Sequence, residues 1–174
     1  MPSRDRKGAV LRYLITFTCY GARLHGNDSG SVDRNHNLPG TRVLAPDPKR
    51  VSSERQDMQN PPYWLDQDGR QAVLRAIRGH CVHRGWNLLA AHVRTSHAHI
   101  ILAAEVPPEK IMGEFKSYSS RELNRLHPDD SFLKRWSRHG STRWLWNDKD
   151  VQAALQYVVE RQGEAMALFV REDL

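Results

Sequence analysis

The sequence predicts one α+β domain, in which an antiparallel sheet of the ferredoxin-like, split βαβ type carries helices packed on one face. Segments rich in β-forming residues alternate with segments of helical period in the order strand, helix, strand, strand, helix, strand. The 174 residues show no internal repeat, low-complexity tract or linker that would separate two cores. Residues 1–174 are therefore expected to form a single domain.

The first strand is predicted at residues 11–20, where apolar and more polar side chains alternate and Gly21 ends the run. Residues 22–62 are rich in Gly, Asn, Asp, Ser and Pro and have little apolar periodicity, which indicates a long loop insertion. The arginine and histidine side chains of this loop either contact phosphate groups or belong to a solvated surface insertion. Both interpretations fit the sequence.

A helix and a hairpin are predicted next. Residues 64–85 carry apolar side chains at helical spacing, and Gly85 is placed as a C-terminal stop. Residues 86–94 and 97–104 are predicted to be strands, and the tight turn between them makes an antiparallel hairpin. The second of these strands is apolar on both faces beyond its histidines, as expected of a central strand.

The remaining third of the chain predicts a helix, a short strand and another helix. The Pro107-Pro108 pair opens a helix that runs to about residue 127, because proline is tolerated in a first helical turn. Residues 142–146 are predicted to be a strand. Asn147 caps a third helix with an apolar stripe, and residues 166–170 either add a final strand or dock on the domain.

Two histidines, His97 and His99, alternate on the predicted strand 97–104. Positions two apart on a strand share a face, so both imidazoles point to one side while Ala98 and Ile100 point to the other. Two neighbouring imidazoles are candidate ligands of one metal ion. A His-x-His strand taken alone more often carries hydrogen-bonded histidines, so the assignment depends on further residues.

The helix that follows offers a carboxylate and a tyrosine. On a helical wheel Glu122 falls about 20° from Phe115, inside the apolar stripe, and Tyr118 lies one turn earlier at the edge of that stripe. A buried carboxylate is costly unless it is paired, so Glu122 is predicted to coordinate the ion held by the two histidines. In the open alternative Glu122 pairs with an arginine such as Arg94, and Tyr118 is a packing residue.

Two imidazoles and a carboxylate leave open coordination positions on a divalent ion, which is typical of a catalytic metal site. Phosphate oxygens suit these positions. Tyr118 is then the candidate nucleophile, because its hydroxyl can attack the phosphorus and form a covalent phosphotyrosine. A tyrosine hydroxyl has an ordinary pKa of about 10, so a cation or base must assist, and Lys116 is a candidate for this role.

At these residues the chain resembles the single-tyrosine HUH transposases, close to the REP-associated tyrosine transposases and IS200-like transposases. The matching segments are the strand around Tyr13, Thr16 and Tyr20-Gly21, the His97-Ala98-His99 strand, the Phe115-Lys116-Ser117-Tyr118 helix with Arg121 and Asn124, and residues 140–146. The resemblance implies an HUH endonuclease fold and a metal-binding enzyme that uses magnesium or manganese. It also implies cleavage and rejoining of single-stranded DNA next to a hairpin through a 5′-phosphotyrosine, the chemistry of DNA transposition and recombination.

Carried over to this sequence, the resemblance makes His97 and His99 metal ligands and Tyr118 the catalytic nucleophile. Relatives often place an amide side chain one turn after the tyrosine, where this chain has Glu122 as the expected third ligand. The expected DNA-binding residues are cations on the helix of Tyr118 and in or beside the basic segment 131–140, namely Lys116, Arg121, Arg138 and Arg143.

Composition favours a polyanionic partner, since 26 Lys and Arg against 20 Asp and Glu give a net charge of +6. Two cysteines are too few for a disulfide framework or a Cys-rich zinc site, which favours a reducing, cytoplasmic location. No apolar run reaches the roughly 18 residues of a spanning helix, so no membrane partner is expected. Monomer and homodimer both stay open.

Two other functions also stay open. A domesticated module would keep hairpin-DNA binding without transposition, although His97, His99 and Tyr118 are all present. A structural zinc protein would close the site with one more ligand, such as His92, and would have no nuclease activity.

Overall fold

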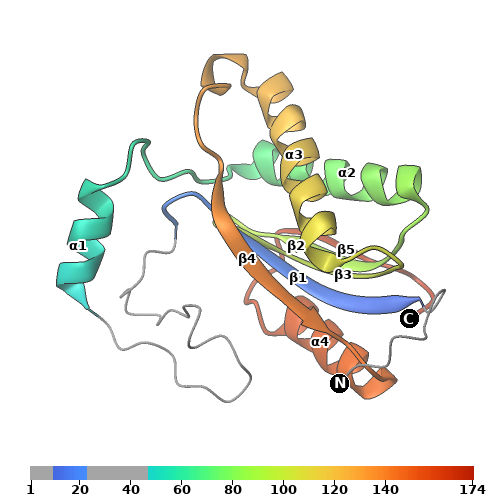
Figure 1. Cartoon of the computed structure of the whole chain (residues 1–174). Coiled ribbons are helices and arrows are strands. Elements are labelled where there is room, and N and C mark those ends of the chain that lie inside the picture. The colour runs from blue at the N-terminus through green and yellow to red at the C-terminus, as the bar shows by residue number, and fades with distance from the viewer. Residues whose placement is uncertain (1–9, 23–46) are drawn as a thin grey trace.

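The computed structural model describes residues 10–22 and 47–174 and is built around a five-stranded antiparallel sheet (Figure 1). The order across the sheet is β4-β1-β3-β2-β5. The strands are β1 (Leu11–Cys19), β2 (Asn87–Val93), β3 (His97–Ala104), β4 (Trp136–Trp144) and β5 (Ala167–Val170). The first four have the order of the split βαβ sheet, so the predicted α+β class is confirmed, and β5 extends the sheet beside β2.

Helices α2 (Gln67–Arg84) and α3 (Pro108–Leu126) cover one face of the sheet (Figure 1). The even-numbered β3 residue Ile100 shares a buried cluster with Ile77 of α2 and Phe115 of α3. Gly85 ends α2 in the left-handed conformation, with φ of 67°, which a residue without a Cβ adopts without strain. The predicted stop of this helix is therefore confirmed.

Helix α4 (Asp148–Glu160) covers the opposite face of the sheet, so the expectation that helices pack on one face only is wrong (Figure 1). Ile101 of β3 and Leu14 of β1 share a second buried cluster with Leu155 and Val158 of α4. The central strands are apolar on both faces, and each apolar face has to be covered by another element.

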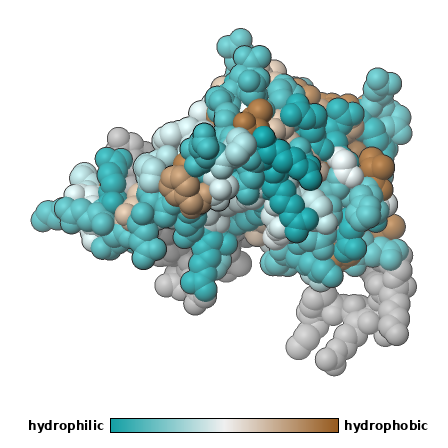
Figure 2. Space-filling view, turned by 90° about the horizontal axis from the view of Figure 1, so that it is seen from above, coloured by the Kyte–Doolittle hydropathy of each residue, from teal (hydrophilic) through white to brown (hydrophobic). Residues whose placement is uncertain are grey.

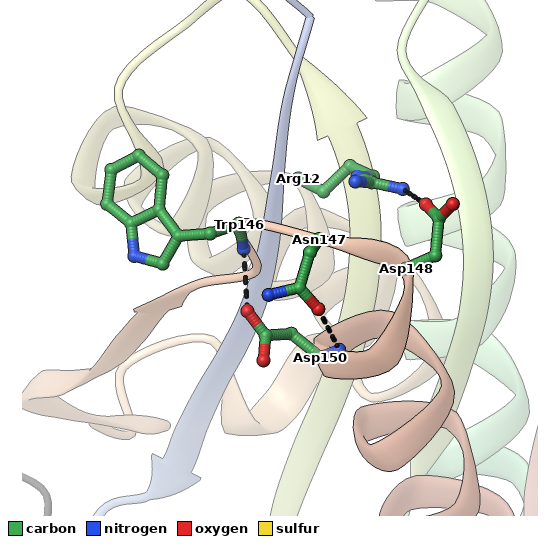
Figure 3. A network of polar contacts seen from close by, with 5 residues as sticks. All are labelled: Arg12, Trp146, Asn147, Asp148 and Asp150. Carbon is green, nitrogen blue, oxygen red and sulfur yellow. Dashed lines mark hydrogen bonds and ion pairs between the residues drawn. The ribbon is translucent and has the colours of Figure 1, made fainter.

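Polar contacts fix the start of α4 (Figure 3). Asn147 is its N-cap, as predicted, and the Asn147 Oδ1 accepts a hydrogen bond of 2.9 Å from the Asp150 N–H. The Asp150 carboxylate in turn accepts from the Trp146 N–H at 2.9 Å. Arg12 of β1 forms an ion pair with Asp148 at 2.5 Å, which ties the first turn of α4 to the sheet.

Two segments differ from the sequence-based expectation. β4 begins at Trp136 and so includes part of the basic segment, because its backbone pairs with β1 along most of its length. Helix α1 (Pro48–Gln56) forms inside the 22–62 insertion, capped by Asp47, and none of its residues is buried. A short 3-10 helix, η1 (Pro128–Asp130), follows α3, and residues 23–46 lie outside the described residues. No helix in the described ranges has the length and apolar character needed to cross a membrane.

Candidate active site

His97 and His99 lie on the face of the sheet that α4 covers. They occupy odd-numbered positions of β3, on the same face as Ile101. Both are buried, and their ring centroids are 4.7 Å apart. The His97 Nδ1 lies 2.9 Å from the Ser96 hydroxyl. The two imidazoles therefore lie side by side, as the alternation along the strand predicts.

His99 is held by hydrogen bonds at both ring nitrogens. Its Nδ1 lies 2.7 Å from the hydroxyl of Thr16, the residue paired with it across β1 and β3. Its Nε2 lies 3.2 Å from the carboxamide oxygen of Gln162, which follows α4 in the chain. These two contacts fix the plane of the ring, because a side chain on each side restrains its rotation.

Tyr157 is the tyrosine beside the histidines. It lies on α4, and its ring centroid is 5.3 Å from that of His99. The side chain is 42% exposed, so a substrate can reach it from solvent. The Gln162 carboxamide N–H donates to the Tyr157 carbonyl at 3.2 Å, and Gly163 turns the chain directly afterwards with φ of 77°. The tyrosine and the amide are thus part of one local structure.

Tyr118 and Glu122 do not join this site, which corrects their expected roles beside His97 and His99. α3 packs on the other face of the sheet, and the Tyr118 ring stacks on His80 of α2 with centroids 4.1 Å apart. Glu122 forms an ion pair with Arg125 on the same helix. In the described part of the chain, no three His, Cys, Asp or Glu side chains gather as a metal site.

The misplacement of Tyr118 and Glu122 is explained by the alternation of side chains between the two faces of β3. The sequence places Ala98 and Ile100 opposite to the histidines, and these two residues are the ones that face α3. A helix that contacts His97 and His99 must therefore cover the other face, and α4 is that helix. Tyr157 followed by Gln162 was visible in the sequence, but only the placement of α4 identifies this pair as the partner of the histidines.

His92, the further ligand considered for a closed zinc site, is engaged elsewhere. It is fully buried beside His99 on β2. The Met166 N–H donates to its Nε2 at 3.1 Å, so its Nδ1 carries the proton and donates to the Val158 carbonyl at 2.9 Å. Burial is the main cause of a lowered pKa for this imidazole, and it holds α4 and the start of β5 together as a neutral group.

The donor set that remains is two imidazole nitrogens and one carboxamide oxygen, from His97, His99 and Gln162. Imidazole nitrogens suit first-row divalent ions, and an uncharged oxygen suits magnesium or manganese. The Gln162 oxygen already lies within hydrogen-bonding distance of a His99 nitrogen. Three protein donors on one side leave positions for substrate oxygens, so these residues fit a catalytic divalent ion.

The four predicted DNA-binding cations fall in different places. Arg143 of β4 pairs across the sheet with Leu14, so it lies on the histidine face, and it is exposed. Arg138 is exposed on the same edge strand. The Arg121 guanidinium lies over the Tyr118 ring on the far face. Lys116 donates to the carbonyls of Ser137 and His139 at 2.8 and 3.1 Å, and burial lowers its pKa, so its ammonium is part of the fold.

Comparison with known proteins supplies the family. The profile of the family described as "Transposase IS200 like" matches residues 62–159, which run from before α2 to the Tyr157 turn of α4. No curated protein matches the sequence.

Solved structures also resemble this one, among them the following two. A REP-associated tyrosine transposase bound to a REP hairpin has 13% sequence identity and a TM-score of 0.48, with 91% of this chain and 70% of that chain covered. A protein of Deinococcus radiodurans R1, described as a candidate transposase, has 17% identity and a TM-score of 0.43, with 95% and 100% covered. Since the family profile spans more than half of the chain, the protein belongs to the IS200-like transposases, a family of DNA-processing enzymes.

Proposed function

We propose that this protein cleaves and rejoins single-stranded DNA in a metal-dependent reaction, with Tyr157 as the nucleophile and His97, His99 and Gln162 as the metal ligands. The observation that carries the proposal is the convergence of the Tyr157 ring and the Gln162 carboxamide on His99. A nucleophile and the donors of a metal site then lie within one small region of one face of the sheet. Tyr118, on the opposite face, has no part in this step.

The cleavage step is a transfer of the phosphoryl group to tyrosine. The Tyr157 hydroxyl oxygen bonds to the phosphorus, the bond from phosphorus to the 3′-oxygen breaks, and the tyrosine proton leaves while the 3′-oxygen takes up one proton. The products are a 5′-phosphotyrosine and a free 3′-hydroxyl. Attack by a 3′-hydroxyl on the phosphotyrosine reverses the step and rejoins DNA, so the energy of the phosphodiester bond is retained.

The chain supplies position and orientation for this chemistry. A bound divalent ion would polarise the scissile phosphate and stabilise the leaving oxygen. The Thr16 hydroxyl contacts the His99 Nδ1 and so orients the ring. The Gln162 carboxamide donates to the Tyr157 carbonyl, which restricts the separation between this ligand and the nucleophile. The exposed ring of Tyr157 is accessible to a single strand, and Arg143 on the same face is a candidate phosphate contact.

Family membership and the positive net charge support DNA as the substrate, and a single-stranded or hairpin form with Mg²⁺ or Mn²⁺ as cofactor is part of the proposal. The experiment incubates the full chain with labelled single-stranded hairpin oligonucleotides and Mn²⁺ or Mg²⁺, and detects adducts that survive denaturation. Wild type is expected to form an adduct and Tyr157→Phe none. Tyr118→Phe is the matched control and is expected to keep the adduct.

Loss of the adduct in Tyr118→Phe, with retention in Tyr157→Phe, would overturn the assignment of the nucleophile. Salt-dependent DNA binding without an adduct in any variant would instead favour a domesticated DNA-binding module.

A further inference from the structure

A groove between α2 and α3 lies on the face of the sheet opposite to the histidines. It encloses about 480 Å³, a volume within the range of small-molecule sites. Its walls are formed by Arg75, Gly79, His80 and His83 of α2 and by Tyr118 of α3, among others. The cleavage chemistry uses none of these residues, so the groove requires a separate explanation.

The wall of the groove is an aromatic stack that is already ordered. The Tyr118 and His80 rings lie 4.1 Å apart with an angle of 28° between their planes. His80 is 5% exposed, and its Nε2 is 2.7 Å from the carboxylate of Glu114, which also contacts Arg84 at 3.2 Å. Glu114 therefore holds the His80 ring in place, and the position of the Tyr118 ring follows from the stack.

Cationic side chains surround this stack. The Arg121 guanidinium lies 4.8 Å from the Tyr118 ring centroid, and Arg75 contributes a second exposed guanidinium to the groove. The one acidic residue in the lining, Glu122, is in an ion pair with Arg125. Figure 2 shows this side of the molecule, where the surface is mostly hydrophilic and hydrophobic residues are scattered.

We propose that the groove binds one unpaired nucleotide of the DNA strand at a distance from the cleavage site. A nucleotide combines a flat aromatic base, which stacks on aromatic rings, with a phosphate that pairs with guanidinium groups. The groove offers both kinds of partner. Its role as a DNA subsite rests on the proposed function, whereas its affinity for a nucleotide unit depends on the groove alone.

Gly79 allows the groove to be filled without disturbing the fold. A Cβ built on Gly79 meets no atom within 4 Å, and the residue lines the groove. Gly79→Gln therefore projects a side chain into the space that the nucleotide would occupy. Gly113→Gln is the matched control, because Gly113 is also an exposed glycine of a helix, with no atom within 4 Å of a built Cβ, and lies outside the groove.

The experiment measures binding of a fluorescently labelled, mixed-sequence single-stranded oligonucleotide by anisotropy, with the full chain carrying Tyr157→Phe to prevent cleavage. Because one base stack is lost, Gly79→Gln is expected to weaken binding roughly tenfold relative to Gly113→Gln. Arg121→Gln is expected to weaken binding and to reduce its dependence on salt. Equal affinities of the two glycine variants would overturn the proposal.

Two further measurements distinguish a nucleotide within DNA from a free nucleotide, and failure of the groove proposal from failure of the cleavage proposal. An oligonucleotide that contains 5-iodouracil is expected to photocrosslink to the peptide that carries Tyr118, and excess AMP is expected to compete only weakly. If AMP binding is lost in Gly79→Gln while oligonucleotide binding is unchanged, the groove binds free nucleotides and its role as a DNA subsite is rejected. Adduct formation is measured separately in a Gly79→Gln chain that keeps Tyr157. If no adduct forms in any chain, the cleavage proposal fails, but the crosslink to the Tyr118 peptide still tests the groove.

Discussion

The carboxamide oxygen of Gln162 lies 3.2 Å from the Nε2 of His99, a residue 63 positions earlier in the chain. Since the carboxamide N–H of Gln162 donates to the Tyr157 carbonyl, the oxygen accepts from the His99 Nε2–H. The His99 Nδ1 is then an acceptor from the Thr16 hydroxyl at 2.7 Å. A metal ion can bind the His99 Nε2 only when the imidazole proton is on Nδ1. The Nδ1–H then donates to the Thr16 oxygen, whose hydroxyl hydrogen rotates away.

Thr16 is therefore predicted to support metal binding without touching the ion. Thr16→Val removes the hydroxyl at nearly constant volume and is expected to weaken Mn²⁺ binding by about 10- to 100-fold. Thr16→Ser keeps the hydroxyl and is expected to bind within a few-fold of wild type. Titration calorimetry with Mn²⁺ and no DNA measures both. A Thr16→Val chain that binds Mn²⁺ as tightly as the serine variant would exclude this role.

Stability is predicted to fall in mild acid through His92. Burial holds the folded-state pKa of His92 below its ordinary value of 6.5, so the unfolded chain binds this proton more readily than the folded chain. The stabilisation is present above pH 6.5 and is lost as the pH falls below that value towards the folded pKa. The free energy of unfolding is expected to lose up to about 1.4 kcal/mol per pH unit in this window.

Urea unfolding at pH 7.5, 6 and 5 measures the slope for wild type and for His92→Gln. The variant is less stable at every pH, because it loses the hydrogen bonds to Val158 and Met166, but its slope is expected to be smaller. Equal slopes in the two chains would assign the acid sensitivity to other groups.

Lys116 and Arg143 are both cations near β4, but Lys116 is predicted to stabilise the fold and Arg143 to bind DNA. Lys116→Met leaves the carbonyls of Ser137 and His139 without their donor and is expected to cost about 1–3 kcal/mol of stability, with little change in DNA affinity. Arg143→Gln is expected to leave stability unchanged and to weaken DNA binding. The slope of log affinity against log salt concentration is expected to fall in magnitude by about one. Thermal unfolding and salt-dependent anisotropy separate the two effects. The opposite pattern would place Lys116 at the DNA.

Local sequence signals predicted the elements of the fold well. The period of two at His97 and His99, the stop at Gly85 and the cap at Asn147 depend on near neighbours in the chain, and the structure has each of them. The sequence pattern does not reveal α1, because none of its nine residues is buried and it therefore has no apolar stripe.

The candidate site was only half predictable. The alternation along residues 97–104 shows which side chains share a face with His97 and His99. It does not show which helix covers that face. That choice depends on packing between residues far apart, such as Leu14 against Leu155. Helical spacing indicates Tyr118 because the wheel places Glu122 near an apolar stripe, but it does not show which side of the sheet that stripe contacts. Tyr157 has no comparable signal in the sequence.

The placement of α4 puts Tyr157 beside His99 of the same polypeptide. The ion pair from Arg12 to Asp148 and the hydrogen bond from His92 to Val158 attach both ends of α4 to strands of the same polypeptide. Under the proposed roles, each polypeptide carries a whole set of reactive groups. A mixture of Tyr157→Phe chains with His99→Ala chains would then stay as inactive as either alone, and in a cell two such alleles would fail to complement each other.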